Sequence, residues 1–244
     1  MNRVLEALER KPFAVVGHRC AAGEALENTL SALKQAIQDG ADIVEVDVQA
    51  TRDGVLVLAH DENLYRIAGV DLNVREATWE EVSRVKLPNG ERVARLDEFL
   101  EHIVDVIPAF IEVKHPEDTP LVLEAVRGFE EWIAIISFHD DAIAQVRRRA
   151  PSIPVGLIYA RPPGRIVDAK RLGARIVLPR YTLATEKAVR FAHRLGLKVV
   201  AWTVNNESTA LQLWKRGVDA IATDYPRRIV ELRRKLQGDE HDSL

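Results

Sequence analysis

Cysteine is nearly absent from this sequence, which has one cysteine, Cys20, in 244 residues. A single cysteine excludes an intrachain disulfide and any zinc site built from several cysteines. The low cysteine content also favours a reducing compartment. Stability therefore has to come from an apolar core, and 47% of the residues are hydrophobic. A chain of this length buries about 70–75% of its unfolded surface on folding, so such a core needs no covalent support.

Long hydrophobic runs and an excess of positive charge are also missing. No apolar run approaches the about 18–20 residues that a membrane span requires. The N-terminal segment MNRVLEALERKPF carries charged residues throughout, unlike a signal peptide. The formal net charge is −3 and the pI is near 6.2, which argues against a strongly basic surface for nucleic acid or anionic membranes. We therefore expect a cytoplasmic protein without a stable membrane anchor or a nucleic-acid partner.

Short apolar runs rich in β-branched residues alternate with helical patterns along the chain. These runs cover residues 13–19, 43–49, 109–114, 132–138, 154–160, 174–180, 198–204 and 220–224. Nearly continuous apolar strands are typical of a parallel sheet covered on both faces. Helical patterns between them end in glycines such as Gly40 and Gly196, as at a helix C-cap. This α/β pattern predicts one (β/α)8 TIM-barrel domain over residues 1–244, although a doubly wound sheet shows the same alternation.

A ninth apolar run, residues 55–60, follows the second strand after only the short segment TRDG (51–54). That connection is too short for a helix, so we predict an antiparallel hairpin with its turn at residues 52–54. This register would place Asp47 roughly opposite His60. The next segment, about residues 61–95, has weak periodicity and polar turns. We predict that it forms an inserted excursion above the barrel mouth, where loops of this fold shape the site.

Charged residues gather where the first three barrel strands and the hairpin end. They are two histidines, three carboxylates, an arginine and a lysine: His18, His60, Glu45, Asp47, Glu112, Arg19 and Lys114. Residues at i and i+2 of a strand share one face, so Glu45 and Asp47 point the same way. These positions could face the surrounding helices and form ordinary ion pairs. Because the pattern repeats on the next strand, we favour an inward cluster, which requires compensation by partners or a metal.

The residue types in this cluster indicate a particular chemistry. Three carboxylates without cysteine suit one hard divalent cation, Mg²⁺ or Ca²⁺. Two histidines beside them, His18 and His60, are candidates for a general acid and a general base. Arg19 and Lys114 would face the same space and bind an anion, most simply a phosphate ester. Together these features predict metal-assisted phosphoryl transfer.

The order and spacing of these motifs resemble the glycerophosphodiester phosphodiesterase family. Residues 17–66 carry in order an H-R pair, E-N-T, E-x-D, T-x-D-G and H-D. Similar later segments are IEVKH (111–115), SFHDDAI (137–143), AWTVNN (201–206) and GVDAIATDYP (217–226). The excursion also contains a T-W-E-E segment of the family type. The resemblance therefore extends over essentially the whole chain.

The resemblance implies a hydrolase that releases sn-glycerol 3-phosphate and an alcohol from a small-molecule glycerophosphodiester. It implies metal ligands at Glu45, Asp47 and Glu112, an acid/base pair at His18 and His60, and phosphate-contacting cations at Arg19 and Lys114. It also implies attack by the glycerol 2-hydroxyl to give a cyclic phosphate, which water then opens. Such intramolecular attack is favourable because the nucleophile is already positioned.

Four further residues near the strand ends could contribute to the site. Trp202, at the end of the seventh strand, is expected to form an apolar wall for the glycerol, and Phe138 could act similarly. Glu27 could line the site or orient a neighbour. Asn28 is expected to be the N-cap of the first helix. These assignments supplement the main cluster.

Two departures from the family pattern stand beside the cluster. Cys20 replaces the family's glycine after H-R, and Leu26 replaces the proline before E-N-T. We expect the larger Cys20 side chain to narrow the phosphate site. Two other functions stay open: lysophospholipase D-type cleavage of a lysolipid, and a non-catalytic barrel that only binds phosphate. The sequence leaves the alcohol group and the oligomeric state undetermined.

Overall fold

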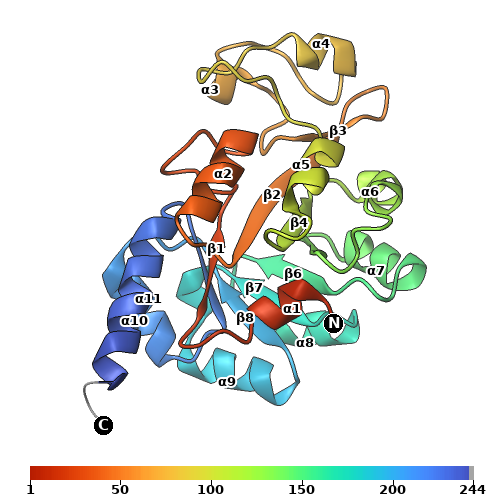
Figure 1. The fold of residues 1–244 in the computed structure, drawn as a ribbon. Helices are drawn as coiled ribbons and strands as arrows, with labels where there is room; N and C mark the ends of the chain where they lie inside the picture. The colour runs from red at the N-terminus through yellow and green to blue at the C-terminus, as the bar shows by residue number, and fades with distance from the viewer. Residues whose placement is uncertain (242–244) are drawn as a thin grey trace.

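Eight parallel strands close into a barrel in the computed structural model, which describes residues 1–241 (Figure 1). They are β1 (Ala14–Gly17), β2 (Ile43–Ala50), β4 (Ala109–Val113), β5 (Ile133–Ser137), β6 (Val155–Tyr159), β7 (Ile176–Pro179), β8 (Lys198–Ala201) and β9 (Ala220–Thr223). Strand β1 pairs with both β2 and β9, which closes the sheet and excludes the doubly wound alternative. The predicted (β/α)8 barrel is confirmed, with a strand in every predicted apolar run.

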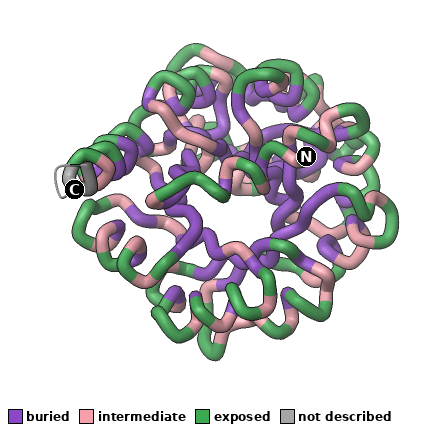
Figure 2. The backbone as a smooth tube through the Cα atoms, turned by 60° about the horizontal axis from the view of Figure 1, so that its bottom comes forward, coloured by how far each residue is buried: buried purple, intermediate pink, exposed green. Residues whose placement is uncertain are grey.

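Helices surround the barrel, one after each of its strands. They are α2 (Leu30–Gln38), α5 (Leu96–Ile103), α6 (Thr119–Ala125), α7 (Asp140–Arg149), α8 (Ile166–Arg171), α9 (Glu186–Arg194), α10 (Glu207–Lys215) and α11 (Pro226–His241), with short 3₁₀ turns η1 (Pro116–Asp118) and η2 (Tyr181–Leu183). Figure 2 shows the buried backbone as an inner ring and the exposed segments at the periphery. Gly40 and Gly196 have φ of 82° and 74°, as the predicted helix ends require. No helix within residues 1–241 has the length and apolar character needed to cross a bilayer.

Alternation along each strand divides the core into two layers. In β2, Val44 and Val46 face outward and pack with the surrounding helices. Ile43 faces the barrel interior, where it packs with inward residues of the other strands. Helix α1 (Arg3–Ala7) closes the end of the barrel away from the excursion, because its fully buried Val4 joins the interior cluster (Figure 1). The helices thus cover the outside while α1 seals the bottom, and the mouth stays open for a site.

The hairpin after β2 is present, but its register differs from the prediction by one residue. Strand β3 (Leu56–Leu58) runs antiparallel to β2 and pairs Leu58 with Val48. The backbone NH of Ala59 donates to the carbonyl of Asp47 over 3.1 Å, so Ala59 and not His60 lies opposite Asp47. The turn itself lies where it was predicted, at residues 52–54 between the bonded pair Thr51 and Val55. A loop centred on residue 53 places residue 59 opposite residue 47, so the predicted pairing was wrong by one position although the turn was placed correctly.

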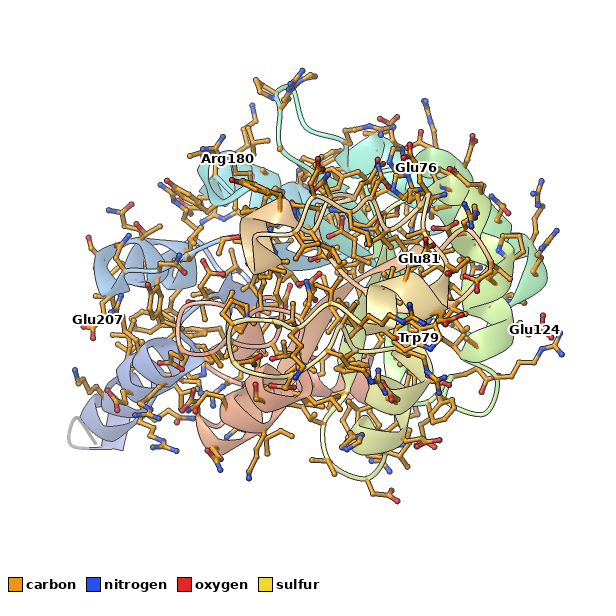
Figure 3. All side chains as sticks on the ribbon, turned by 90° about the horizontal axis from the view of Figure 1, so that it is seen from above. Glu76, Trp79, Glu81, Glu124, Arg180 and Glu207 are labelled. Carbon is orange, nitrogen blue, oxygen red and sulfur yellow. The ribbon has the colours of Figure 1, made fainter. Side chains whose placement is uncertain are left out.

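The predicted excursion follows this hairpin and lies above the barrel mouth (Figure 1). It contains α3 (Tyr65–Ala68) and α4 (Trp79–Ser83) and has its own small core of Val57, Ala59, Leu64, Val74, Ala77, Val82, Val85, Leu87 and Val93. Figure 3 looks down on this excursion, with Glu76, Trp79 and Glu81 labelled. A separate core lets the excursion hold a defined position over the site.

Packing of the outer helices onto the strands predicts a large cost for removing one buried aromatic ring. Phe99 of α5 is fully buried in the outer cluster. We expect Phe99→Ala to lower the free energy of unfolding by about 3–5 kcal/mol, because it leaves a cavity. Denaturant titration measures this change. Val106 is 55% exposed, so Val106→Ala should change stability by less than about 0.5 kcal/mol. Equal effects of the two substitutions would contradict the assigned packing.

Candidate active site

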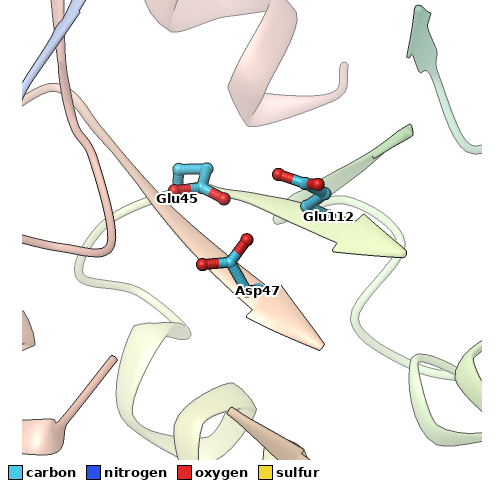
Figure 4. Close-up of side chains that lie close together, drawn as sticks. All are labelled: Glu45, Asp47 and Glu112. Carbon is cyan, nitrogen blue, oxygen red and sulfur yellow. The ribbon is translucent and has the colours of Figure 1, made fainter. Parts of the chain in front are cut away.

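Three carboxylates from neighbouring strands point into the same space at the barrel mouth (Figure 4). Glu45 and Asp47 belong to β2 and Glu112 to β4, and one oxygen of each lies within 4.8 Å of the others. Their exposed fractions are only 5%, 1% and 8%. They continue the inward face that begins at Ile43, so the alternative that they form ordinary ion pairs with the helices is wrong.

Two cations approach this group but compensate it incompletely. The Lys114 Nζ lies 3.3 Å from Glu112 Oε1 and 3.5 Å from Asp47 Oδ1. The Arg19 Nε lies 3.4 Å from Asp47 Oδ2. Within residues 1–241, the buried Glu45 Oε1 has no hydrogen-bond partner. Three carboxylates against two cations, with one oxygen unpartnered, fit a hard divalent cation that takes oxygen ligands.

Burial and mutual repulsion separate the pKa values of the three carboxyls. Burial raises the pKa of Glu45 well above its usual range, and the charges of Asp47 and Glu112 add to this. Burial, and then the charge of Asp47, raises the pKa of Glu112 to about 8. Burial would also raise the pKa of Asp47, but Lys114 and Arg19 outweigh it and lower that pKa. The cluster therefore resists carrying three negative charges unless a further cation is present.

Each candidate catalytic histidine is held by a carboxylate. His18 Nδ1 lies 2.7 Å from Asp224 Oδ1, and Asp224 Oδ2 accepts a hydrogen bond of 2.8 Å from Asn205. His60 Nδ1 lies 2.7 Å from Asp61 Oδ1. Burial would raise the pKa of Asp224, but the hydrogen bond and charge of His18, the hydrogen bond from Asn205 and the charge of Arg19 together lower that pKa. In both histidines the carboxylate contact is made by Nδ1, so Nε2 is the ring nitrogen that can contact a ligand.

Asp61 and Asp224 are site residues that the sequence reasoning missed. A signal existed for each of them. Asp61 follows His60 directly, and Asp224 comes at the end of the last barrel strand, where this fold places its functional side chains. A carboxylate at such a position can orient a histidine from another strand.

The loop after β1 sets the position of Arg19 and contradicts the expectation for Cys20. Arg19 and Cys20 have φ of 48° and 70°, in the left-handed region. This turn directs the Arg19 backbone NH to Glu45 Oε2 at 2.8 Å and places the Cys20 side chain in the core between barrel and helices, fully buried. Cys20 therefore does not narrow the phosphate site. Leu26, the other departure, packs against the core of the excursion.

Asn28 has a different role from the expected one. The N-cap of α2 is Thr29, whose side chain accepts from the backbone NH of Ala32. Asn28 lies in the left-handed region with φ of 56°, and its amide bonds Asp47 twice. Its Nδ2 donates to Asp47 Oδ2 over 3.0 Å and its Oδ1 accepts from the Asp47 backbone NH over 3.1 Å. The prediction was wrong because Asn and Thr are both good N-caps, and only the fold shows that Asn28 supports a buried carboxylate.

The charged groups form one side of a cavity of about 280 Å³. Its wall consists of His18, Arg19, Glu45, His60, Glu112, Lys114, Phe138, Trp202 and Thr203, with Val16, Phe110, Ile136, Ile158, Leu178, Val200 and Ala222 also lining it. Phe138 and Trp202 meet edge to face, with ring centroids 5.7 Å apart. Trp202 Nε1 donates to the Leu178 carbonyl over 2.7 Å, which fixes the indole as an apolar wall. Glu27 lies beside this cavity and pairs with Arg19.

The fold and the site together define a class of protein, a (β/α)8 barrel whose mouth carries an acidic group that could hold a metal ion, with two cationic side chains beside it. The profile of the Glycerophosphoryl diester phosphodiesterase family matches residues 18–228. This chain belongs to that family, and the prediction that it is a phosphodiesterase is confirmed.

Known proteins of this family are similar over nearly their full length. A glycerophosphodiester phosphodiesterase of Caldanaerobacter subterraneus is 33% identical over 239 residues, with 91% of this chain and 98% of the relative covered. A solved structure from Silicibacter pomeroyi has a TM-score of 0.89 at 26% identity, with 97% and 99% of the two chains covered. An Oleispira antarctica phosphodiesterase, solved in complex with the product sn-glycerol-3-phosphate, has a TM-score of 0.84 at 26% identity, with 90% and 96% covered.

The raised pKa of Glu112 predicts how metal binding changes stability with pH. Without a cation, folding favours the protonated carboxyl, so its contribution to stability is complete below pH 4.5 and is lost as the pH rises to about 8. A bound divalent cation removes this loss because it stabilises the ionised form. We expect the rise in melting temperature caused by Mg²⁺ or Ca²⁺ to grow from pH 4.5 to pH 8. Thermal melts with cation or chelator measure it, and a shift independent of pH would contradict this account.

The burial of Cys20 predicts an unreactive thiol. Burial raises the pKa of Cys20 well above its usual range, and the nearby charges of Glu45 and Asp47 add to this. We expect a thiol reagent to modify Cys20 only when the protein unfolds, because the thiolate is the reactive form. A disulfide reagent that releases a coloured thiolate when it reacts is used, and the absorbance of that thiolate measures the labelling of Cys20 in native and in denaturing buffer. Cys20→Gly should keep kcat within about tenfold, or about 1.4 kcal/mol of barrier, and rapid native labelling with loss of activity would refute the assignment.

Proposed function

We propose that this protein hydrolyses glycerophosphodiesters to sn-glycerol 3-phosphate and an alcohol, with one divalent cation and two catalytic histidines. The observation that carries the proposal is one cavity lined by Glu45 and Glu112 of the acidic cluster, by both carboxylate-held histidines, and by Arg19 and Lys114. The product bound to the Oleispira antarctica phosphodiesterase supports the same substrate class. A phosphodiester is the ligand that these groups suit best, because it is anionic and needs proton transfer at two oxygens.

Glu45, Asp47 and Glu112 are the residues that would hold the cation, Mg²⁺ or Ca²⁺. When bound, the ion would act as a Lewis acid toward phosphoryl oxygens. Arg19 and Lys114 would neutralise the negative charge that develops on those oxygens. The side chains of Arg19 and Lys114 are already held by Asp47, so they need little reorganisation when substrate binds.

The two histidines would move the protons of the reaction at their Nε2 atoms. One takes the proton of the glycerol 2-hydroxyl as its oxygen forms a bond to phosphorus. The other gives a proton to the alcohol oxygen as the bond between that oxygen and phosphorus breaks. In the second step water donates its proton to one histidine and opens the cyclic phosphate, while the ring oxygen receives a proton from the other. Asp224 and Asp61 keep the rings oriented throughout.

The apolar surfaces favour a small diester over a long-chain lysolipid. Phe138 and Trp202 offer a short apolar wall for the glycerol carbons. Apolar residues of the excursion could instead have formed a groove for an acyl chain. Leu64 is buried in the excursion's core, and Ile67 and Leu72 pack against it. These side chains therefore stabilise the excursion itself.

The proposal predicts metal-dependent release of sn-glycerol 3-phosphate from glycerophosphocholine by the purified protein. Chelation should abolish the activity, and Glu45→Gln should lower it by orders of magnitude. His18→Ala or His60→Ala should lower kcat by about 10²–10⁴ and keep the thermal shift caused by the cation. Coupled assay of the product, with a lysolipid as second substrate, measures these effects. His102 bonds only its own helix, so His102→Ala is the control that keeps full activity.

Three outcomes would contradict parts of this scheme. Undiminished hydrolysis after exhaustive chelation would refute the metal dependence. Loss of the cation-induced thermal shift in a histidine variant would show that this histidine is a metal ligand. Faster turnover of the lysolipid than of glycerophosphocholine would replace the substrate class by that of a lysophospholipase D.

A further inference from the structure

One arginine of the excursion connects two separate parts of the candidate site. Arg66 lies in α3, above the barrel mouth. Its guanidinium bonds the carboxylate of Asp61 through Nε and the carboxylate of Glu27 through Nη1. The two carboxylates come from different places, since Asp61 follows the hairpin and Glu27 precedes α2. The excursion is thereby joined to the first loop of the barrel.

Each of these carboxylates uses its other oxygen to hold a proposed catalytic or phosphate-contacting group. Asp61 Oδ1 lies 2.7 Å from His60 Nδ1. Glu27 Oε2 pairs with the Arg19 guanidinium. A continuous chain therefore runs from His60 through Asp61, Arg66 and Glu27 to Arg19. Arg66 is its central member and the only member that touches both carboxylates, while it stands outside the residues that line the cavity.

The chemistry of the contact requires a guanidinium. A planar fork with several fixed N–H donors can bond two carboxylates in different directions, whereas an ammonium acts as a point charge. Glu27 is only 9% exposed, and each of its two carboxylate oxygens is bonded by an arginine, Oε2 by Arg19 and Oε1 by Arg66. The fold of α3 does not depend on this contact, because the adjacent Leu64 is 1% exposed in the excursion's own core. Removal of the Arg66 guanidinium should therefore change the orientation of Asp61 and Glu27 more than it changes the stability of the fold.

We propose that Arg66 is a positioning residue that orients His60 through Asp61 and Arg19 through Glu27. This inference rests on the proposed function, because its readout is the hydrolysis of a glycerophosphodiester. Without Arg66, Asp61 loses the partner that fixes its carboxylate plane, and His60 becomes free to rotate away from the leaving or attacking oxygen. Glu27 then pairs with Arg19 alone and holds that cation more tightly, away from the phosphate.

Arg66 acts on the site through two arms, the contact with Asp61 that leads to His60 and the contact with Glu27 that leads to Arg19. The two arms should have different effects on kcat and KM. Loss of His60 orientation lowers kcat, and loss of Arg19 placement raises KM for the anionic substrate. Asp61→Asn removes the first arm and should act mainly on kcat. Glu27→Gln removes the second arm and should act mainly on KM. Arg66→Ala should show both effects, each of about 10–100-fold, the size usual for groups that orient a site from behind.

The test measures kcat and KM of the cation-loaded protein on glycerophosphocholine for the parent, Arg66→Ala, Arg66→Lys and Arg84→Ala. Arg84 is the matched control, an arginine of the same excursion at the C-cap of α4 that pairs with Glu80 of that helix and has a side chain that is 74% exposed. Melting temperatures report folding, and calorimetry with inorganic phosphate reports the Arg19 arm without turnover. Millimolar guanidinium is then added to each variant to replace the missing group.

We expect Arg66→Ala to lose kcat and phosphate affinity at an unchanged melting temperature, and to regain activity with guanidinium. Arg66→Lys should be intermediate, and Arg84→Ala should match the parent and gain nothing from guanidinium. Parent-like kinetics in Arg66→Ala, or losses in a folded Arg66→Ala that guanidinium does not reverse, would overturn the inference. If the parent itself does not hydrolyse the diester while Arg84→Ala and the parent are folded and bind cation, the proposed function has failed instead.

Discussion

Burial of three carboxylates in one small space is the constraint on which the rest of the site depends. Glu45, Asp47 and Glu112 bring their oxygens within 4.8 Å inside a barrel whose other inward residues are largely apolar. Such a cluster is unfavourable unless hydrogen bonds and cations compensate it. The surrounding groups supply that compensation in part, through an ammonium, a guanidinium, the Asn28 amide and a backbone NH. The buried Glu45 Oε1 stays without a hydrogen-bond partner among the described residues, which is why the cluster suits a metal ion.

The same electrostatic logic extends outward from the cluster. His18 contacts the carboxylate of Asp224 and His60 that of Asp61. Arg19 pairs with the carboxylates of Glu27 and Asp47. Alternating charges of this kind keep long side chains in one orientation before substrate arrives. They also explain why a half-exposed residue such as Arg66 can matter, since it bonds two carboxylates, of which Asp61 contacts His60 and Glu27 pairs with Arg19.

The mouth has two chemically different sides because different strands build them. The charged side comes from β1, β2 and β4 and the hairpin, and the apolar side includes Phe138 after β5 and Trp202 after β8. A diester bound between these sides would direct its phosphate to the cations and its glycerol carbons to the rings. The ends of the barrel strands would thus orient the two halves of the substrate.

The sequence by itself determined the alternation of eight strands with helices, the hairpin, the excursion and the shared face of the acidic residues. These features follow from local rules, since apolar alternation with helices and the spacing i, i+2 act over a few residues. Only the tertiary structure decided the hairpin register, the burial of Cys20 and the double hydrogen bond from Asn28 to Asp47. It also brought Asp224 to His18 across a separation of 206 residues. Such pairings depend on barrel closure and on left-handed turns, which no local pattern specifies.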